Sequence, residues 1–129
     1  MILAVEGLRP KTVKSFPVIE RALNSLKSYG PRSYAILTND AGEFIQVAGG
    51  KVTCIVEVKS KENNVISRAY LENKKVPFSG SQIISCGAGE IKAEPEEFLF
   101  IKDVVLLFKC FFDGEGFSDE FLWRENPLN

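Results

Sequence analysis

The sequence of 129 residues contains no histidine. Histidine is the side chain whose charge changes near neutral pH, and it therefore carries much general acid–base catalysis. Its absence excludes the Ser–His and Cys–His machinery of nucleophilic catalysis. Chemistry that needs carboxylates alone, as in glycoside hydrolysis or magnesium-dependent phosphoryl transfer, stays open on this ground.

Cysteine is also scarce, and Cys54, Cys86 and Cys110 lie far apart in the sequence. No Cys-x-x-Cys pair is present, and structural zinc sites need closely spaced ligands, so we expect no metal site. Cys54 and Cys110 lie in apolar runs, which is typical of small buried residues. Cys86 is followed by Gly87 and Gly89. It is either a small residue at a strand end, which is the commoner outcome, or a reactive thiol.

Long apolar runs are missing as well. No stretch approaches the roughly 20 residues that span a bilayer. Residues 1–5 are apolar, but they are too short for a signal-peptide core and have no basic leader. We therefore expect a cytoplasmic protein without membrane contact. Residues 87–89 contain two glycines but no G-x-G-x-x-G motif, so no phosphate cradle and no cofactor are expected.

What is present most strongly is a strand pattern. Residues 33–59 contain three runs rich in β-branched and aromatic residues, separated by turn residues at 39–42 and by Gly49-Gly50. Gly49-Gly50 predicts a two-residue hairpin turn, because glycine adopts the positive φ angles that such turns need. A fourth run at 65–71 extends this to an antiparallel meander over residues 33–71. With short strands predicted at 2–8 and 82–86, we expect an antiparallel sheet of about five strands.

Two helices are predicted to pack on this sheet. The N-terminal helix has Ser15 as its N-cap and Pro17 in its first turn, and it ends at Gly30-Pro31. The C-terminal helix falls in the most apolar block, residues 98–112, with Asp103 on its polar side. Its apolar stripe is broader than one sheet face requires, so it is either a buried core helix or meets a partner chain at its edge. Residues 118–122 are predicted to add one helical turn. The chain is thus predicted to be α+β, with residues 1–129 forming one domain.

Charge is distributed unevenly along the chain. Residues 1–89 contain 12 Lys or Arg and 7 Asp or Glu, whereas residues 90–129 contain 4 and 10. The acidic third is either an ordinary solvated surface or a patch that meets a basic partner. Basic residues are scattered singly apart from Lys74-Lys75, without interleaved aromatics, so we expect no direct contact with nucleic acid.

The candidate partner-binding residues lie at the acidic C-terminal end. They are Asp113, Glu115, Phe117, Asp119, Glu120, Trp123 and Arg124, with Glu94, Glu96 and Glu97 as further candidates. Their spacing does not fit a calcium loop, because Glu125 stands one place too late for the terminal bidentate ligand. Trp123 beside Arg124 is a pair of the type enriched at binding hot spots, although core closure explains Trp123 equally well.

One pair of charges is predicted to be structural. Glu57 and Arg68 fall on neighbouring predicted strands, where they are placed to pair across the sheet. Such a cross-strand pair explains these two residues without any chemistry.

A family resemblance adds a specific function. It spans about residues 33–125 and is carried by Tyr34-Ala35-Ile36-Leu37, residues 44–49, residues 54–58, Asp103-Val104-Val105, Leu107-Phe108, Phe111 and Phe121-Leu122-Trp123-Arg124. In this order the elements resemble the small α+β immunity proteins that accompany bacterial polymorphic toxins and contact-delivered effectors. The resemblance implies an intracellular protein that binds one cognate toxin domain and blocks its active site, without catalysis or a cofactor. It assigns no contact residue.

Two other functions stay open. A structural or adaptor subunit would self-associate through a sheet edge or through the C-terminal helix, and would show a symmetric interface. A small-ligand-binding protein or a carboxylate enzyme would show a cavity in which acidic side chains converge.

Overall fold

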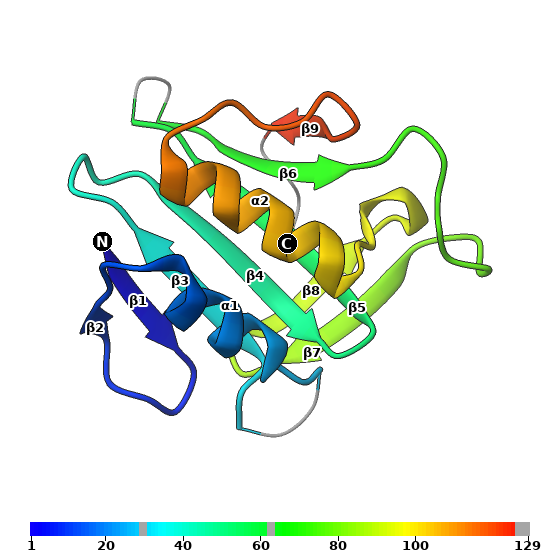
Figure 1. Cartoon of the computed structure of the whole chain (residues 1–129). Coiled ribbons are helices and arrows are strands. Elements are labelled where there is room, and N and C mark those ends of the chain that lie inside the picture. The colour runs from blue at the N-terminus through cyan, green and yellow to red at the C-terminus, as the bar shows by residue number, and fades with distance from the viewer. Residues whose placement is uncertain (29–30, 62–63, 126–129) are drawn as a thin grey trace.

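The computed structural model describes residues 1–28, 31–61 and 64–125. A seven-stranded antiparallel sheet has the order β2-β1-β3-β4-β5-β6-β9, and two helices lie on one of its faces (Figure 1). The strands of this sheet are β1 (Ile2–Val5), β2 (Lys11–Thr12), β3 (Tyr34–Thr38), β4 (Phe44–Gly50), β5 (Thr53–Lys59), β6 (Ile66–Tyr70) and β9 (Leu122–Glu125). The remaining elements are α1 (Phe16–Asn24), a separate hairpin of β7 (Gln82–Cys86) and β8 (Gly89–Ala93), the 3-10 helix η1 (Pro95–Glu97), and α2 (Ile101–Asp113).

The α+β class and the meander are confirmed, but the strands are more numerous than predicted. β3, β4, β5 and β6 pair consecutively, as a meander requires. β2, β8 and β9 were not predicted, and β9 begins where residues 118–122 were expected to be helical. β9 forms because its four residues pair with β6, with Trp123 opposite Ala69. None of the described helices is long and apolar enough to cross a membrane.

The predicted turn at Gly49-Gly50 is wrong in its position. Both glycines continue β4, and the chain reverses after them at Lys51, which has a φ of 69°. A Cβ on Gly50 would lie 2.6 Å from the carbonyl carbon of Leu26, just after α1. Glycine is therefore needed here for the close approach of two backbones, as well as for the turn that follows.

Both helices start or end at different residues than predicted. α1 follows Ser15 as expected but ends at Asn24, where the Ser25 hydroxyl donates a 2.6 Å hydrogen bond to the Ala22 carbonyl. Gly30, the predicted end, lies outside the described residues. α2 begins only at Ile101, because residues 98–99 enter the core in extended form.

Asp103 was predicted on the polar side of α2, but it is buried in the first turn of the helix. Its carboxylate accepts a 3.0 Å hydrogen bond from the Phe100 backbone N–H and so satisfies a helix N-terminus. Lys75 forms an ion pair of 3.2 Å with the same carboxylate. Asp103 therefore caps the start of α2 and does not lie on the solvent-exposed side of the helix.

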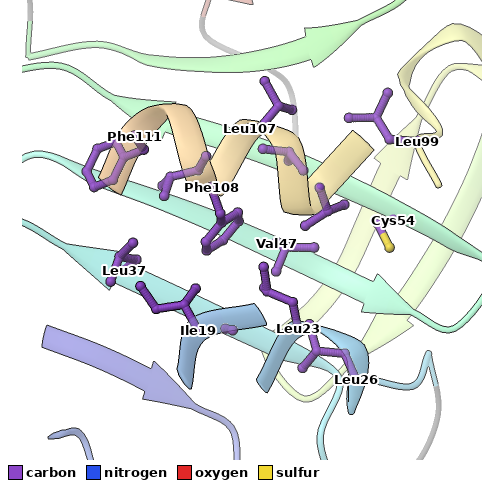
Figure 2. Close-up of a cluster of buried hydrophobic side chains, with 14 of the residues drawn as sticks. Ile19, Leu23, Leu26, Leu37, Val47, Cys54, Leu99, Leu107, Phe108 and Phe111 are labelled. Carbon is purple, nitrogen blue, oxygen red and sulfur yellow. The ribbon is translucent and has the colours of Figure 1, made fainter. Parts of the chain in front are cut away.

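The main core lies between the helices and the sheet. Figure 2 shows side chains of both helices directed toward the strands; the labelled ones include Ile19 and Leu23 of α1, Leu107 and Phe108 of α2, and Leu37 and Val47 of the sheet. All but Val47, at 1%, have no exposed surface. The interpretation of the C-terminal helix as a buried core helix is confirmed, with Leu106 the one large apolar side chain of α2 that is 40% exposed.

The opposite face of the sheet, which we call the outer face, is covered differently. The β7–β8 hairpin lies behind the strands in Figure 1, on the side away from the helices. A small apolar cluster of Ile55, Val76, Ala93 and Phe98 joins it to the sheet. Residues 82–86 thus form the predicted strand, but it pairs with β8 alone and not with the main sheet.

Candidate functional site

The predicted contact residues run from the last residue of α2, Asp113, through the connection of residues 114–121 into β9. α2 ends at Gly114, whose left-handed conformation (φ 71°) is the usual end of a helix. Residues 114–121 then run along the edge of the sheet before β9 returns beside β6 (Figure 1). This short connection holds the candidate residues close to a rigid edge strand.

An aromatic pair lies at the centre of this segment. The rings of Phe117 and Trp123 are tilted against each other, with their centroids 4.9 Å apart, and both side chains are half-buried. Trp123 also packs against the main core, so core closure and surface presentation are combined in one residue. Beside the pair lies a shallow pocket of about 170 Å³, to which Val58 and Ser67 contribute.

Four exposed carboxylates belong to the same segment: Asp113, Glu115, Asp119 and Glu120. Asp113 is partly neutralised, because its carboxylate lies 2.9 Å from the Lys109 ammonium group. The other three form no ion pair with any described residue. We call Asp113, Glu115, Phe117, Asp119, Glu120 and Trp123 together the acidic–aromatic surface.

Arg124 does not belong to that surface. Successive residues of a strand point to opposite faces, and the register places Trp123 opposite Ala69 and Arg124 opposite Arg68. Trp123 therefore faces the helices while Arg124 lies on the outer face. The two residues of the predicted Trp–Arg hot spot therefore lie on opposite faces of the sheet.

On the outer face Arg124 joins a row of alternating charges. Arg68 donates hydrogen bonds of 3.0 and 2.8 Å to one oxygen of Glu57 and one of 3.1 Å to Glu97. The other oxygen of Glu97 accepts a 2.5 Å hydrogen bond from Arg124, which also reaches Glu96 at 3.2 Å. We call this group the charge row; it consists of Glu57, Arg68, Glu97, Arg124 and Glu96. The predicted pairing of Glu57 with Arg68 is confirmed.

Burial makes this row more than a surface ion pair. Arg68 is 1% exposed, Glu97 3% and Glu57 6%. Removing a single partner from such a group leaves an uncompensated buried charge, which is strongly destabilising. Burial alone would lower the pKa of Arg124, but the carboxylates of Glu96 and Glu97 outweigh it and raise that pKa. The Arg124 guanidinium therefore keeps its charge at the end of the row.

The three further acidic candidates bind other residues of the protein. Glu97 is buried in the charge row, and Glu96 is bound to Arg124. Glu94 accepts a 2.7 Å hydrogen bond from the Ser81 hydroxyl. These residues therefore do not extend the acidic–aromatic surface.

The three cysteines are unpaired and differ in their exposure. Cys54 is fully buried, and burial raises the pKa of its thiol to about 12, so it is protonated at neutral pH. Cys86 and Cys110 are partly exposed and unpaired. Among the described residues, no group of three or more Cys, Asp or Glu side chains is arranged to hold a metal ion.

The two edge strands of the main sheet are where two copies of the chain would pair if they associated through the sheet. The edge strands are β2, with two residues, and β9, with four. Short edge strands offer few free backbone groups to another chain, so the geometry does not favour pairing of copies through an edge of the main sheet.

Fold and surface together define an α+β protein with an exposed acidic–aromatic segment. Comparison of the chain with protein-family models, with curated proteins and with solved structures gives no match.

Proposed function

We propose that this protein acts by binding a partner protein through the acidic–aromatic surface, and that the partner is a toxin domain which it neutralises, as an immunity-type protein does. The observation that carries the binding proposal is the half-buried Phe117–Trp123 pair in a segment with four exposed carboxylates. The specific role as an immunity protein rests on the resemblance in the order of the elements.

The two kinds of side chain have separate tasks in this proposal. Glu115, Asp119 and Glu120 attract a basic cleft of the kind that holds nucleic acid or nucleotide, and their charges accelerate the encounter. Phe117 and Trp123 supply apolar area at a fixed position, because Trp123 is held by the main core. A surface of this kind occupies an active site without performing chemistry.

Co-expression tests the proposal. The proposal predicts that a toxin domain is encoded beside the gene of this chain, and that the parent chain restores growth of cells that produce this domain. The double variant Asp119→Lys/Glu120→Lys reverses two of the exposed charges. It should slow association of the purified proteins at low salt by about tenfold and flatten its salt dependence.

A matched control carries the same change of charge elsewhere. Glu20→Lys/Asp40→Lys also replaces two exposed carboxylates, one on α1 and one in the turn after β3. It should associate nearly as fast as the parent chain. Failure of the parent chain to rescue growth would contradict the immunity role, and equal slowing by both variants would contradict the assignment of the surface.

A further inference from the structure

A cavity of about 260 Å³ lies between the outer face and the β7–β8 hairpin. Its floor is formed by Ile36, Ala48 and Ile55, which come from the neighbouring strands β3, β4 and β5. Its roof is formed by Ala88 and Ile91 of the hairpin. No residue of the acidic–aromatic surface lines it, so this is a second and separate site.

Hydrogen bonds attach the hairpin to the rest of the protein at two places. At its tip, the Gly87 backbone N–H donates a 2.8 Å hydrogen bond to the Ser33 hydroxyl. At β8, the Arg68 guanidinium donates a 2.8 Å hydrogen bond to the Lys92 carbonyl. Ala88 and Ile91 lie in the sequence between these two anchors, and they line the cavity from above. The charge row thus supports the roof.

One end of the cavity is polar. Gln46 and Glu57 are opposite each other in the register of β4 and β5, and the Gln46 amide N–H donates a 2.8 Å hydrogen bond to Glu57 Oε1. Glu57 is the one charged side chain among the described residues that line the cavity. Arg68 holds the other oxygen of Glu57. Gln46 and Glu57 therefore offer acceptor oxygens at this end, and Tyr34 is a further lining residue with a polar group.

We propose that this cavity binds a small, mainly apolar amine or alcohol. Its volume of about 260 Å³ lies just below the roughly 300–1,000 Å³ of typical small-molecule pockets, so it suits a small ligand of about ten non-hydrogen atoms. The ligand head donates a hydrogen bond to Glu57 Oε1 or to the Gln46 carbonyl, and its apolar body lies between Ile55 and Ile91. A carboxylate ligand is rejected, because it would meet the negative charge of Glu57 while Arg68, which does not line the cavity, is already engaged.

Titration of the isotope-labelled full chain tests this assignment. Phenethylamine and 2-phenylethanol are the probes with a donor head, and phenylacetate is the matched probe with an anionic head. Amide resonances of residues 46–57 and 87–92 should shift saturably with both donor probes, with a Kd of about 1 mM or tighter. Phenylacetate should bind at least about tenfold more weakly.

Two variants fill the cavity from opposite sides. Ala48→Leu adds bulk to the floor, and Ala88→Leu adds it to the exposed tip of the roof, where a larger side chain does not disturb folding. Each should weaken phenethylamine binding at least about tenfold. Ala41→Leu, which adds the same side chain in an exposed turn, should bind like the parent chain.

Several results would each overturn the proposal. They are the absence of a saturable shift with the donor probes, binding of phenylacetate as tight as that of the donor probes, and binding of phenethylamine to Ala88→Leu as tight as to the parent chain. Shifts confined to the acidic–aromatic surface would also overturn it. None of these results bears on growth rescue, so the cavity and the proposed function fail or succeed independently.

Discussion

The two faces of the sheet are covered in different ways. On one face, α1 and α2 contribute apolar side chains that interlock with the strands, and residues such as Leu107 and Phe108 have no exposed surface. On the outer face, a two-stranded hairpin covers only part of the sheet, and buried ions and a cavity lie beneath or beside it. The helix-covered face explains why the chain folds. The outer face needs another explanation, because a buried ion pair is weak as a source of net stability.

The comparison suggests what the charge row does. Arg68 links three elements: it binds Glu57 on β5, Glu97 on η1 and the Lys92 carbonyl on β8. An apolar side chain in its place would fill space but would not hold these elements at fixed positions. We therefore attribute to the row the positioning of the hairpin above the cavity.

The largest effect is expected in the helix-covered core. Phe108→Ala removes a ring with no exposed surface and should lower the free energy of unfolding by about 3–5 kcal/mol, since a cavity is left behind. Leu106→Ala on the same helix, where the side chain is 40% exposed, should cost less than about 1 kcal/mol. Urea denaturation measures both. Equal costs would show that α2 is not packed as described.

The next effect concerns the charge row. Arg68→Met should lower the free energy of unfolding by about 3 kcal/mol, because Glu57 and Glu97 lose their shared buried cation. Lys75→Met breaks an ion pair with Asp103 whose lysine side chain is 40% exposed, and it should cost less than about 1 kcal/mol. If both variants cost the same in urea denaturation, the row does not act as a buried unit.

The smallest effect is expected for Glu6, whose partner Ser33 also binds the tip of the hairpin. Hydrogen bonds from the Ser33 hydroxyl and backbone N–H lower the pKa of the Glu6 carboxyl from its ordinary value of 4.5. A lowered pKa in the folded state contributes stability that is complete above the ordinary value and is lost as pH falls through the lowered one. Glu6→Gln should therefore make stability less sensitive to acid below pH 4.5.

Acid titration of the folded chain measures this last effect. The same Ser33 hydroxyl accepts the hydrogen bond from the Gly87 N–H, so the Gly87 amide resonance should report the titration in the parent chain and not in Glu6→Gln. Glu20→Gln, an exposed carboxylate on α1, is the control and should leave the profile of Gly87 unchanged. A Gly87 resonance that does not move with pH in the parent chain would contradict the link.

The sequence predicted the helix-covered face well and the outer face poorly. Periodicity reports which side chains point into a core, so the meander and both helices could be predicted. The boundaries depended on contacts that no local pattern contains. Gly50, for example, continues β4 by pairing with Thr53 of β5, and its lack of a side chain leaves room for the backbone after α1.

The site shows the same division. Glu57 and Arg68 could be paired because they fall on consecutive strands, whereas Glu97 and Arg124 join them only through the fold. β9 has four residues, too few for a periodic signal, so the separation of Trp123 from Arg124 could not be foreseen. The cavity depends on the return of the hairpin over the sheet, a long-range arrangement that strand propensity does not encode.

Native-state hydrogen exchange of the full chain compares the two faces most directly. If the hairpin is a separately anchored roof, amides of the β7–β8 ladder should exchange through a local opening, with a free energy at least about 2 kcal/mol below that of amides in β3, β4 and β5. Phenethylamine should slow exchange of the hairpin amides, because the ligand binds the closed form and not the opened one. Equal opening free energies for the hairpin and the central strands, unchanged by phenethylamine, would contradict the account.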